Sequence, residues 1–265
     1  MPAHQQLHDL LEQYRAGTLS LDEAAEAIGG LRLDRIGDFA CIDLGRQVRC
    51  GMPEVVLAEG KAPEHLAEIV IRLARASGRC IVTRLSDAQV DLIRSTAETE
   101  GIRIDYRATG RVLVAGNGPA PQRTGGIVAI VTAGTSDIRV AEEARIIAEE
   151  MGCEVRTAYD VGAAGIHRLF PALKPLLGAH AFVVCAGREG TLPAVVAGLV
   201  DRPVIGVPVS VGYGYMGGGQ AALASMLQSC SVIAVVNIDA GFTGGAFAAR
   251  IANQGAEIPG GRKGP

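Results

Sequence analysis

The pattern that most constrains this fold is a strand, a turn and a helix between Gly125 and Ala148. Residues 127–131 (Ile-Val-Ala-Ile-Val) form an unbroken, mostly β-branched run without polar alternation. Such a run is typical of a strand that is buried on both faces of a parallel sheet. The polar turn 132–137 follows, and a helix is predicted to begin at Ile138. We therefore expect an α/β fold built on a parallel sheet.

The turn after this strand has the composition of an anion-binding site. Thr135, Ser136 and Asp137 can each cap the helix, and Gly134 allows a close approach to the backbone. Several N–H groups would then point outward at the positive end of a helix, where phosphate or carboxylate binds. A small polar turn before a helix is also often no more than a cap. The turn alone leaves both interpretations open.

From residue 127 onward, predicted strands and helices alternate with short connections. The strands are expected at about 127–132, 154–159, 180–185, 203–207 and 231–236, and the helices at about 138–151, 164–173, 192–200, 218–229 and 243–254. Five such units imply a doubly wound, flavodoxin-like parallel sheet of five strands with right-handed crossovers. Ligands bind these sheets at the carboxyl ends of the strands, so the loops after the strands carry the candidate residues.

Residues 116–126 are dense in glycine and proline, as in segments that join domains. We place a boundary there and predict two domains, 1–120 and 121–265. The first is predicted to be a small α+β domain that begins with two short helices. Its strand-like runs 39–44 and 54–58 have the pattern of a hairpin or a bulged pair. A helix from Pro63 to about Gly78, a strand at 80–83, a helix from Ser86 to about Glu100 and strands at 102–106 and 112–115 complete it.

Composition excludes several classes of protein. The 265 residues carry a net charge of −3 and no tryptophan, which leaves no basic or aromatic surface for nucleic acid. No apolar run is long enough to span a membrane, and residues 1–17 lack the apolar core of a signal peptide, so we expect a cytoplasmic protein. The six cysteines form no CxxC motif and no close Cys/His pairing, which predicts neither a disulfide framework nor a zinc site.

Ionisable side chains follow the second and fifth predicted strands. Asp160, His167 and Arg168 come after the second strand and suit anion contacts or proton transfer. A histidine at a helix start is also often a cap or a packed ring. Asn237 and Asp239 end the fifth strand, where Asp239 could bind a metal or a ribose, or simply cap the last helix.

Glycines shape the loops after the third and fourth predicted strands. Arg188 and Glu189 lie between two glycines, an unusual setting for an ionisable pair because the backbone must turn sharply there. The segment 212–219 after the fourth strand contains five glycines. It is either a flexible lid or a surface on which a ligand lies close to bare backbone.

Longer segments of the second half resemble the aminoimidazole ribonucleotide carboxylase family of purine synthesis. The matching segments are 133–137, 166–168, 186–187 with 192–193, 203–209 and 221–228. Two departures point elsewhere within that fold: the purine enzymes carry a histidine in the loop where this chain has 188–191, and a Met-Pro pair where it has Ser229-Cys230. Together with segments 53–61, 132–137, 160–168 and 237–239, they resemble the LarB family of nickel-pincer cofactor biosynthesis, over both halves of the chain.

This resemblance implies a carboxylase and hydrolase that acts on nicotinic acid adenine dinucleotide or an NAD-like analogue. The products would be pyridinium-3,5-biscarboxylic acid mononucleotide and AMP, with carbon dioxide or bicarbonate as co-substrate and no organic cofactor. Cleavage of a diphosphate concentrates negative charge, so Mg²⁺ is expected, with Asp137, Asp160 and Asp239 as candidate ligands. The family fold implies a homo-oligomer such as an octamer, with no nucleic acid or membrane partner. The alternatives are a purine-type carboxylase or mutase and a non-catalytic nucleotide-sensing module.

The resemblance and the loop positions together assign roles to individual residues. Cys230 would add as a thiolate to C4 of the pyridinium ring, which makes C5 nucleophilic toward carbon dioxide. Glu189 is expected either to act as general base for the C5 proton or the thiol proton, or to orient water and a divalent ion for cleavage of the phosphoanhydride. His167 is the alternative base. Cys230 follows a predicted helix, whose negative end disfavours a thiolate, so the cationic ring or Arg188 would have to compensate. The expected substrate-binding residues are Gly134, Thr135, Ser136, Asp137, Asp160, Arg168, Gly187, Arg188, Gly217, Gly218, Asn237 and Asp239.

Overall fold

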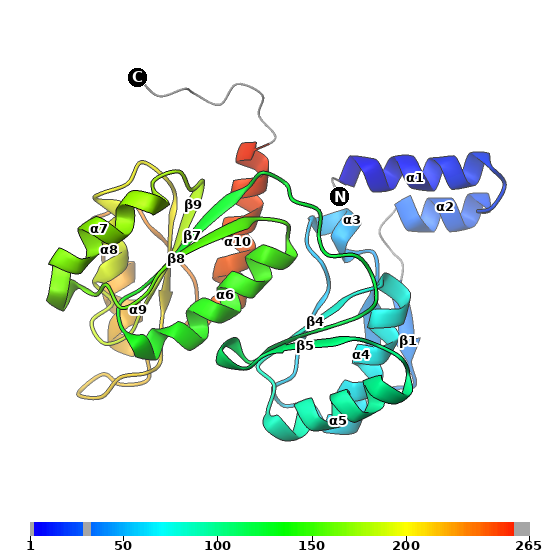
Figure 1. Cartoon of the computed structure of the whole chain (residues 1–265), viewed down its shortest axis with the longest axis horizontal. Helices are drawn as coiled ribbons and strands as arrows, with labels where there is room; N and C mark the ends of the chain where they lie inside the picture. The colour runs from blue at the N-terminus through cyan, green and yellow to red at the C-terminus, as the bar shows by residue number, and fades with distance from the viewer. Residues whose placement is uncertain (1–2, 29–32, 257–265) are drawn as a thin grey trace. The chain divides into compact units, whose positions relative to one another are not determined.

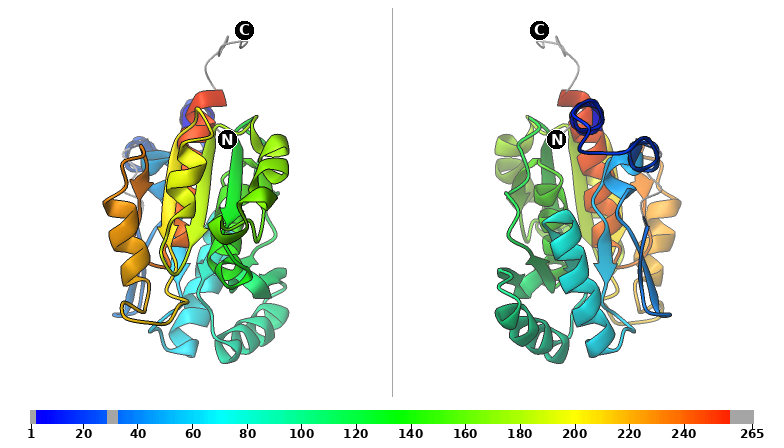
Figure 2. Two further views of the ribbon diagram at one scale, coloured as in Figure 1. Left: turned by 90° about the vertical axis from the view of Figure 1, so that its left-hand side faces the viewer. Right: turned by 90° about the vertical axis from the view of Figure 1, so that its right-hand side faces the viewer.

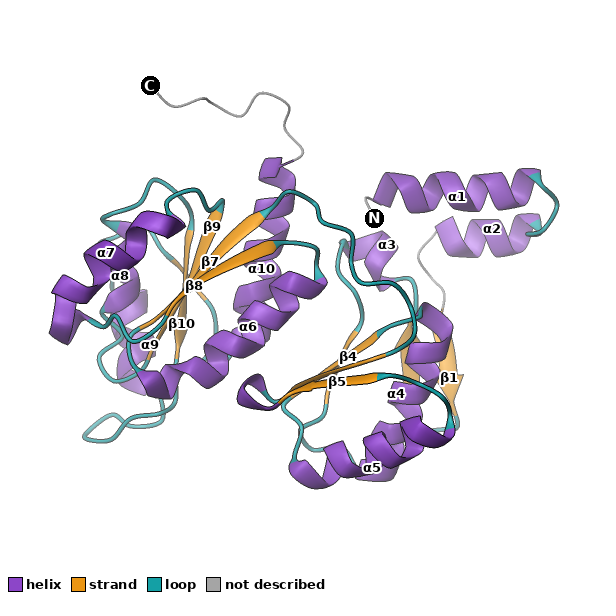
Figure 3. Cartoon of the chain, viewed as in Figure 1, coloured by secondary structure: helices purple, strands orange, loops and turns teal. Residues whose placement is uncertain are grey.

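The structure is a computed structural model that describes residues 3–28 and 33–256 (Figure 1). The chain divides into two compact units, residues 1–120 and 121–265. Each unit has its own cluster of buried apolar side chains, and helices and strands follow one another in both (Figure 3). None of the described helices is long and apolar enough to cross a membrane.

The first unit opens with two helices, α1 (Ala3–Arg15) and α2 (Leu21–Ile28), which lie side by side in Figure 1. Ser20 begins α2 through reciprocal contacts with Glu23. The backbone N–H of Ser20 donates to Glu23 Oε2 at 2.8 Å, and the N–H of Glu23 donates to Ser20 Oγ at 3.3 Å. This reciprocal pair satisfies two helix-end donors and fixes the start of α2 after Ser20.

The rest of the first unit is built on a four-stranded sheet in the order β3-β4-β6-β5. Its strands are β3 (Val55–Leu57), β4 (Cys80–Thr83), β5 (Ile104–Arg107) and β6 (Val112–Ala115), joined through α4 (Pro63–Ser77), α5 (Asp87–Thr99) and the short turn η1 (Ala108–Gly110). β3 and β4 are parallel, and β6 is antiparallel to both β4 and β5. The apolar face of α4 supplies much of the core, as its helical periodicity predicts.

The predicted pairing of 39–44 with 54–58 is wrong. β2 (Ala40–Asp43) instead pairs with β1 (Leu33–Ile36) in an antiparallel hairpin, while β3 pairs in parallel with β4. A short helix, α3 (Arg46–Cys50), separates β2 from β3 and ends at Gly51 with a left-handed φ of 69°. Because α3 carries the chain away from β2, β3 finds its partner across the α4 crossover instead.

The second unit contains five parallel strands in the order β11-β10-β9-β7-β8, which confirms the doubly wound sheet. They are β7 (Ile127–Thr132), β8 (Glu154–Ala158), β9 (Ala181–Ala186), β10 (Val204–Pro208) and β11 (Ala234–Val235). Every residue of β9 and β10 is buried, in line with their unbroken apolar sequences. From β7 the chain adds β8 on one side and then crosses to add β9 on the other side of β7. The strand order therefore reverses between β7 and β9, although all five strands are parallel.

Helices cover both faces of this sheet (Figure 2). One face carries α6 (Ile138–Glu150) and α10 (Gly241–Ala256), and the other carries α7 (Leu169–Leu173), α8 (Leu192–Ala197) and α9 (Gln220–Leu227). Several predicted elements are shorter than expected, including α8, which ends at Ala197. β11 spans two residues, α9 starts after the left-handed Gly219 (φ 81°), and non-helical Gly165 confines α7 to five residues behind the turn η3 (Ala163–Arg168).

We expect Gly245→Ala to destabilise the second unit, because α10 lies against α6 at this residue. A Cβ atom at Gly245 would lie 2.3 Å from the carbonyl oxygen of Ala144. Backbone atoms cannot move aside as the end of a flexible side chain can, so the two helices would separate. This would lower the free energy of unfolding by about 1–3 kcal/mol. Urea unfolding measures the loss. Gly198→Ala, whose Cβ would meet Val195 O at an ordinary 3.5 Å, is the matched control. Equal unfolding midpoints for the two variants would contradict the close approach.

Candidate functional site

Asp137 connects the loops that follow β7 and β9, the two strands between which the strand order reverses. It ends the turn η2 (Thr135–Asp137) after β7, and its side chain is only 4% exposed. The N–H of Gly134 donates to Oδ2 at 2.8 Å, and the N–H of Gly187, after β9, donates to Oδ1 at 3.2 Å. Burial raises the pKa of Asp137 above its ordinary value, while these N–H bonds favour the carboxylate. The carboxylate holds the two loops together, which favours a structural role.

The two residues before Asp137 face outward. Thr135 and Ser136, which immediately precede Asp137 in the sequence, are exposed at the beginning of α6. Their backbone and hydroxyl groups therefore remain accessible at a helix start, the setting in which anions bind. The predicted anion-binding turn thus has two parts: the buried Asp137 connects two loops, while Thr135 and Ser136 face solvent.

The loop after β8 presents an ion pair at the same edge of the sheet. The Arg168 guanidinium donates to Asp160 Oδ2 at 2.6 Å, with both side chains nearly half exposed. Asp160 has a left-handed φ of 57°, and its N–H donates to the buried Thr132 Oγ1 at 3.0 Å. His167 is exposed on η3 beside Arg168. Asp160 therefore orients Arg168, while His167 is open to solvent.

A second carboxylate ties together the loops after β10 and β11. Asp239, with a φ of 56°, accepts hydrogen bonds from both the N–H (2.9 Å) and the hydroxyl of Ser210. The guanidinium of Arg139, in the first turn of α6, lies 3.8 Å from Asp239 Oδ2. Asn237 is exposed nearby along the chain, and its side chain accepts from the N–H of Ile238. The position of Asp239 is thus set by loop contacts that the sequence alone did not reveal.

The predicted metal ligands do not form a metal site. Within residues 3–28 and 33–256, no group of three or more His, Cys, Asp or Glu side chains could hold an ion. Asp137 is committed to backbone N–H groups, Asp160 to Arg168 and Asp239 to Ser210. The donor set of one chain therefore does not fit a resident Mg²⁺.

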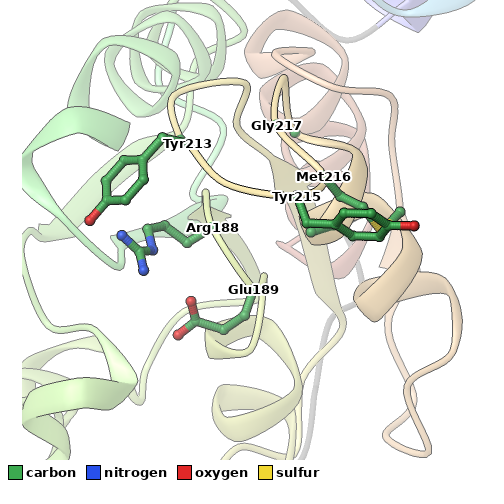
Figure 4. Close-up of a pocket in the computed structure, with 9 residues that line it drawn as sticks. Arg188, Glu189, Tyr213, Tyr215, Met216 and Gly217 are labelled. Atoms are coloured by element: carbon green, nitrogen blue, oxygen red, sulfur yellow. The ribbon is translucent and has the colours of Figure 1, made fainter.

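Arg188 and Glu189 line a pocket of about 300 Å³ with the glycine-rich loop (Figure 4). The other lining residues are Gly212, Tyr213, Tyr215, Met216, Gly217, Gly219 and Ala221. Arg188 has a left-handed φ of 45°, and its guanidinium carbon lies 4.5 Å from the centre of the Tyr213 ring. A Cβ atom at Gly190 would lie 2.6 Å from Ala222 O, so only glycine fits this approach. The glycine-bracketed pair Arg188 and Glu189 therefore does face a cavity. Gly218 lies in the chain between Gly217 and Gly219, which both line it.

Sequence reasoning missed the aromatic part of this pocket. Tyr213 and Tyr215 alternate with Gly212 and Gly214 in a loop that follows a buried strand. Two aromatic residues between glycines at the carboxyl end of a parallel strand are a recognisable signal of a ligand-contacting loop. The glycines alone drew attention to the segment as a lid or a bare surface.

Cys230 lies where the strands of the sheet begin, opposite the edge formed by their carboxyl ends. It is exposed in the segment between the end of α9 and the start of β11, and β11 runs parallel to β10. A segment that precedes a parallel strand lies where the strands begin, whereas Glu189 follows a strand end. One chain therefore does not bring Cys230 and Glu189 together. Beside Cys230, Leu227 and Val232 are 66% and 94% exposed.

The buried cysteines are poor nucleophile candidates. Burial raises the pKa of Cys153 to about 11, and it raises the pKa of Cys80 and Cys185 further above the ordinary value. Since the thiolate is the reactive form, these three thiols are protonated and inert at neutral pH. Cys230 and Cys41 are exposed.

Both units match known families. Residues 33–117 match the LarB/PurE-like N-terminal domain, and residues 127–258 match the AIR carboxylase family. The uncharacterized protein MJ0165 of Methanocaldococcus jannaschii is 44% identical over 252 residues, which are 93% of this chain and 96% of that protein. This chain belongs to the LarB/PurE-like AIR carboxylase superfamily. The family resemblance read from the sequence is confirmed.

Other members of the superfamily match a smaller share of the chain. A probable N5-carboxyaminoimidazole ribonucleotide mutase of Methanothermobacter thermautotrophicus is 34% identical over 131 residues, 47% of this chain and 37% of that protein. The N5-carboxyaminoimidazole ribonucleotide mutase of M. jannaschii is 33% identical over 119 residues, 43% of this chain and 71% of that protein. Membership of the AIR carboxylase superfamily indicates an enzyme of the carboxylase or mutase type.

Proposed function

We propose that this enzyme carboxylates C5 of the pyridinium ring of nicotinic acid adenine dinucleotide and hydrolyses the phosphoanhydride to release AMP. The observation that carries the proposal is the exposed pair Arg188 and Glu189, which a strained loop presents to a pocket at the carboxyl edge of the sheet. A cationic ring joined to a diphosphate requires both signs of charge in its site. A carboxylate and a guanidinium side by side supply them.

The carboxylation needs a nucleophile because a pyridinium ring is electron-poor. In the proposed step, the Cys230 thiolate bonds to C4, and the ring becomes a neutral dienamine whose C5 attacks carbon dioxide. Glu189 then accepts the proton from C5, and the C4–S bond breaks so that the thiolate leaves with its electron pair. The ring regains its aromaticity and its positive charge. The cysteine is thus consumed in one step and regenerated in the next.

We propose that the thiol acting at each pocket comes from another copy of the chain. Cys230 lies at the opposite sheet edge from Glu189, so the two groups need a homo-oligomer in which different edges meet. The exposed side chains of Leu227 and Val232 beside Cys230 supply apolar surface for such a contact. This proposal is consistent with the oligomer that the fold family implies.

The phosphoanhydride is proposed to lie across the start of α6. The N–H groups near Thr135 and Ser136 and the guanidinium of Arg168 would bind its oxygens and stabilise the charge that develops on cleavage. Thr135 and Ser136 follow β7, which neighbours β9 in the sheet, and Arg168 follows β8, on the far side of β7.

The decisive experiment offers each candidate substrate with ¹³C-bicarbonate and follows the products by mass spectrometry. We expect the dinucleotide to yield AMP and a mononucleotide with one labelled carboxyl group. The competing function, a purine-type mutase, is favoured by the relatives that carry that name. Turnover of N5-carboxyaminoimidazole ribonucleotide, with none of the dinucleotide, would establish that alternative.

We expect Ser136→Phe to weaken dinucleotide binding by at least tenfold, about 1.4 kcal/mol, because the ring would cover the donors at the helix start. Ser136 is exposed, so the melting temperature should stay close to that of the parent. Calorimetric titration and thermal unfolding measure the two effects. Ser95→Phe, at an exposed site on α5 in the first unit, is the control. Parallel losses of affinity and stability in Ser136→Phe would favour the purely structural cap.

A further inference from the structure

The loop 212–219 exposes three large side chains beside the pocket. Tyr213 is 81% exposed, Tyr215 is fully exposed and Met216 is 42% exposed. Each side chain of this size stabilises a fold by about 1.5–3 kcal/mol when it is fully buried. Because these three are exposed, they contribute little of that stabilisation. All three line the pocket. Their exposure therefore points to contact with a ligand.

Glycines determine how the loop presents these side chains. Gly219 anchors one end, because a Cβ atom there would lie 2.8 Å from Ile238 and 3.2 Å from Ser210. Gly214 (φ 109°) and Gly218 (φ 63°) adopt left-handed conformations with open space around them. One end of the loop is thus fixed against the segments that follow β10 and β11, and the two tyrosines lie apart on the rest of it (Figure 4).

The two tyrosines point to opposite sides of the loop (Figure 4). On one side, the Tyr213 ring receives the Arg188 guanidinium, and Glu189 lies next to them. This side is charged. On the other side, Tyr215 lies beside Met216, and both side chains are uncharged. The pocket therefore has one wall suited to charged groups and another suited to a flat, uncharged ring.

We propose that Tyr215 and Met216 form a stacking platform for the uncharged aromatic base of a nucleotide ligand. The charged half of the ligand lies toward Arg188 and Glu189. A cationic ring does not share the Tyr213 face, because the guanidinium already covers it at 4.5 Å. This inference rests on the proposed function for the identity of the whole ligand, in which the uncharged base is the adenine.

Binding of two half-ligands tests the platform directly. We expect Tyr215→Ala to weaken binding of AMP by about thirtyfold, the middle of the range for losing a base-stacking ring. Tyr215→Phe keeps the ring and should bind AMP within about twofold of the parent. Nicotinic acid mononucleotide lacks the uncharged base, so its affinity should be the same for all three proteins. Tyr14→Ala, at an exposed tyrosine on α1, is the matched control.

Each contrary result has a defined meaning. Equal affinity of Tyr215→Ala and the parent for AMP, or no binding of AMP by the parent, overturns the platform even if carboxylation proceeds. A change in sedimentation of Tyr215→Ala with unchanged AMP affinity also overturns it, since the ring then serves contact between copies. Loss of AMP binding in Tyr215→Ala supports the platform even where the parent fails to carboxylate the dinucleotide, a result that refutes the proposed function alone.

Discussion

Cys230→Ala is expected to abolish carboxylation of the dinucleotide while the protein remains folded and binds the dinucleotide. Without a thiolate at C4 the pyridinium ring cannot become nucleophilic at C5, so no slower route through the same intermediate exists. The side chain is exposed, so its truncation should change the free energy of unfolding by no more than about 0.5 kcal/mol. Incorporation of ¹³C-bicarbonate, thermal unfolding and calorimetric titration measure the three properties.

Cys41→Ala provides the control for this experiment. Cys41 is the other exposed cysteine among the described residues, and it lies on β2 in the first unit. This variant should carboxylate at the parent rate. Near-normal carboxylation by Cys230→Ala would refute the covalent mechanism and leave the purine-type reaction, which needs no cysteine, as the better reading.

Mixing two inactive variants tests whether the thiol comes from another copy. Subunits carrying Cys230→Ala retain Glu189, and subunits carrying Glu189→Gln retain the thiol. If the two groups meet across a contact between copies, mixed oligomers contain some sites with both groups and regain activity. Mixtures that stay as inactive as the separate variants would place both groups of a site in one chain, contrary to the positions of Cys230 and Glu189 on the sheet.

Glu189→Gln is expected to lower turnover by at least about a hundredfold, the lower range for the loss of a positioned general base. The amide keeps the size of the side chain and much of its hydrogen bonding but cannot accept the C5 proton. Glu189 is exposed on the pocket wall, where water screens its attraction to the cationic ring, and the phosphates are proposed to bind at the start of α6, so affinity for the dinucleotide should change little. Steady-state kinetics should therefore show a fall in kcat, and calorimetric titration a nearly constant Kd.

Glu98→Gln, at an exposed position on α5, controls for a general loss of charge. If Glu189→Gln retains more than about a third of the parent rate, well outside the range for a lost base, the assignment moves to His167. His167 is exposed on η3 after β8, next to the ion pair of Arg168 and Asp160. His167→Asn would then be the variant in which turnover falls.

Local patterns predicted most of the second unit because they carry their own physical cause. The run 127–131 is apolar on both faces, and the structure buries it as β7 between two helical layers. Short βα connections restrict the sheet to parallel, right-handed topology, and five such units predicted the doubly wound sheet that the structure shows. The glycines around Arg188 and Glu189 likewise indicated a tight loop, which a left-handed Arg188 and the close approach of Gly190 to Ala222 now explain.

Errors in the first unit arose where a strand had to choose its partner. The runs 39–44 and 54–58 are close in sequence and have strand-forming residues, so local reasoning paired them. The structure pairs the first with β1 and the second with β4, which lies beyond the whole of α4. Strand propensity is a local property, but pairing depends on which edge is available after the rest of the chain has folded.

The chemistry of the site shows the same division. Residue type and position relative to a strand were enough to select Ser136, Arg168, Arg188 and Glu189 as candidates. Only the tertiary structure decided that Asp137 is a buried tie between two loops, that Tyr213 and Tyr215 complete the pocket wall, and that Cys230 belongs to the opposite sheet edge. Burial and proximity result from packing between segments distant in sequence, whereas turns, caps and strand periodicity result from neighbours along the chain.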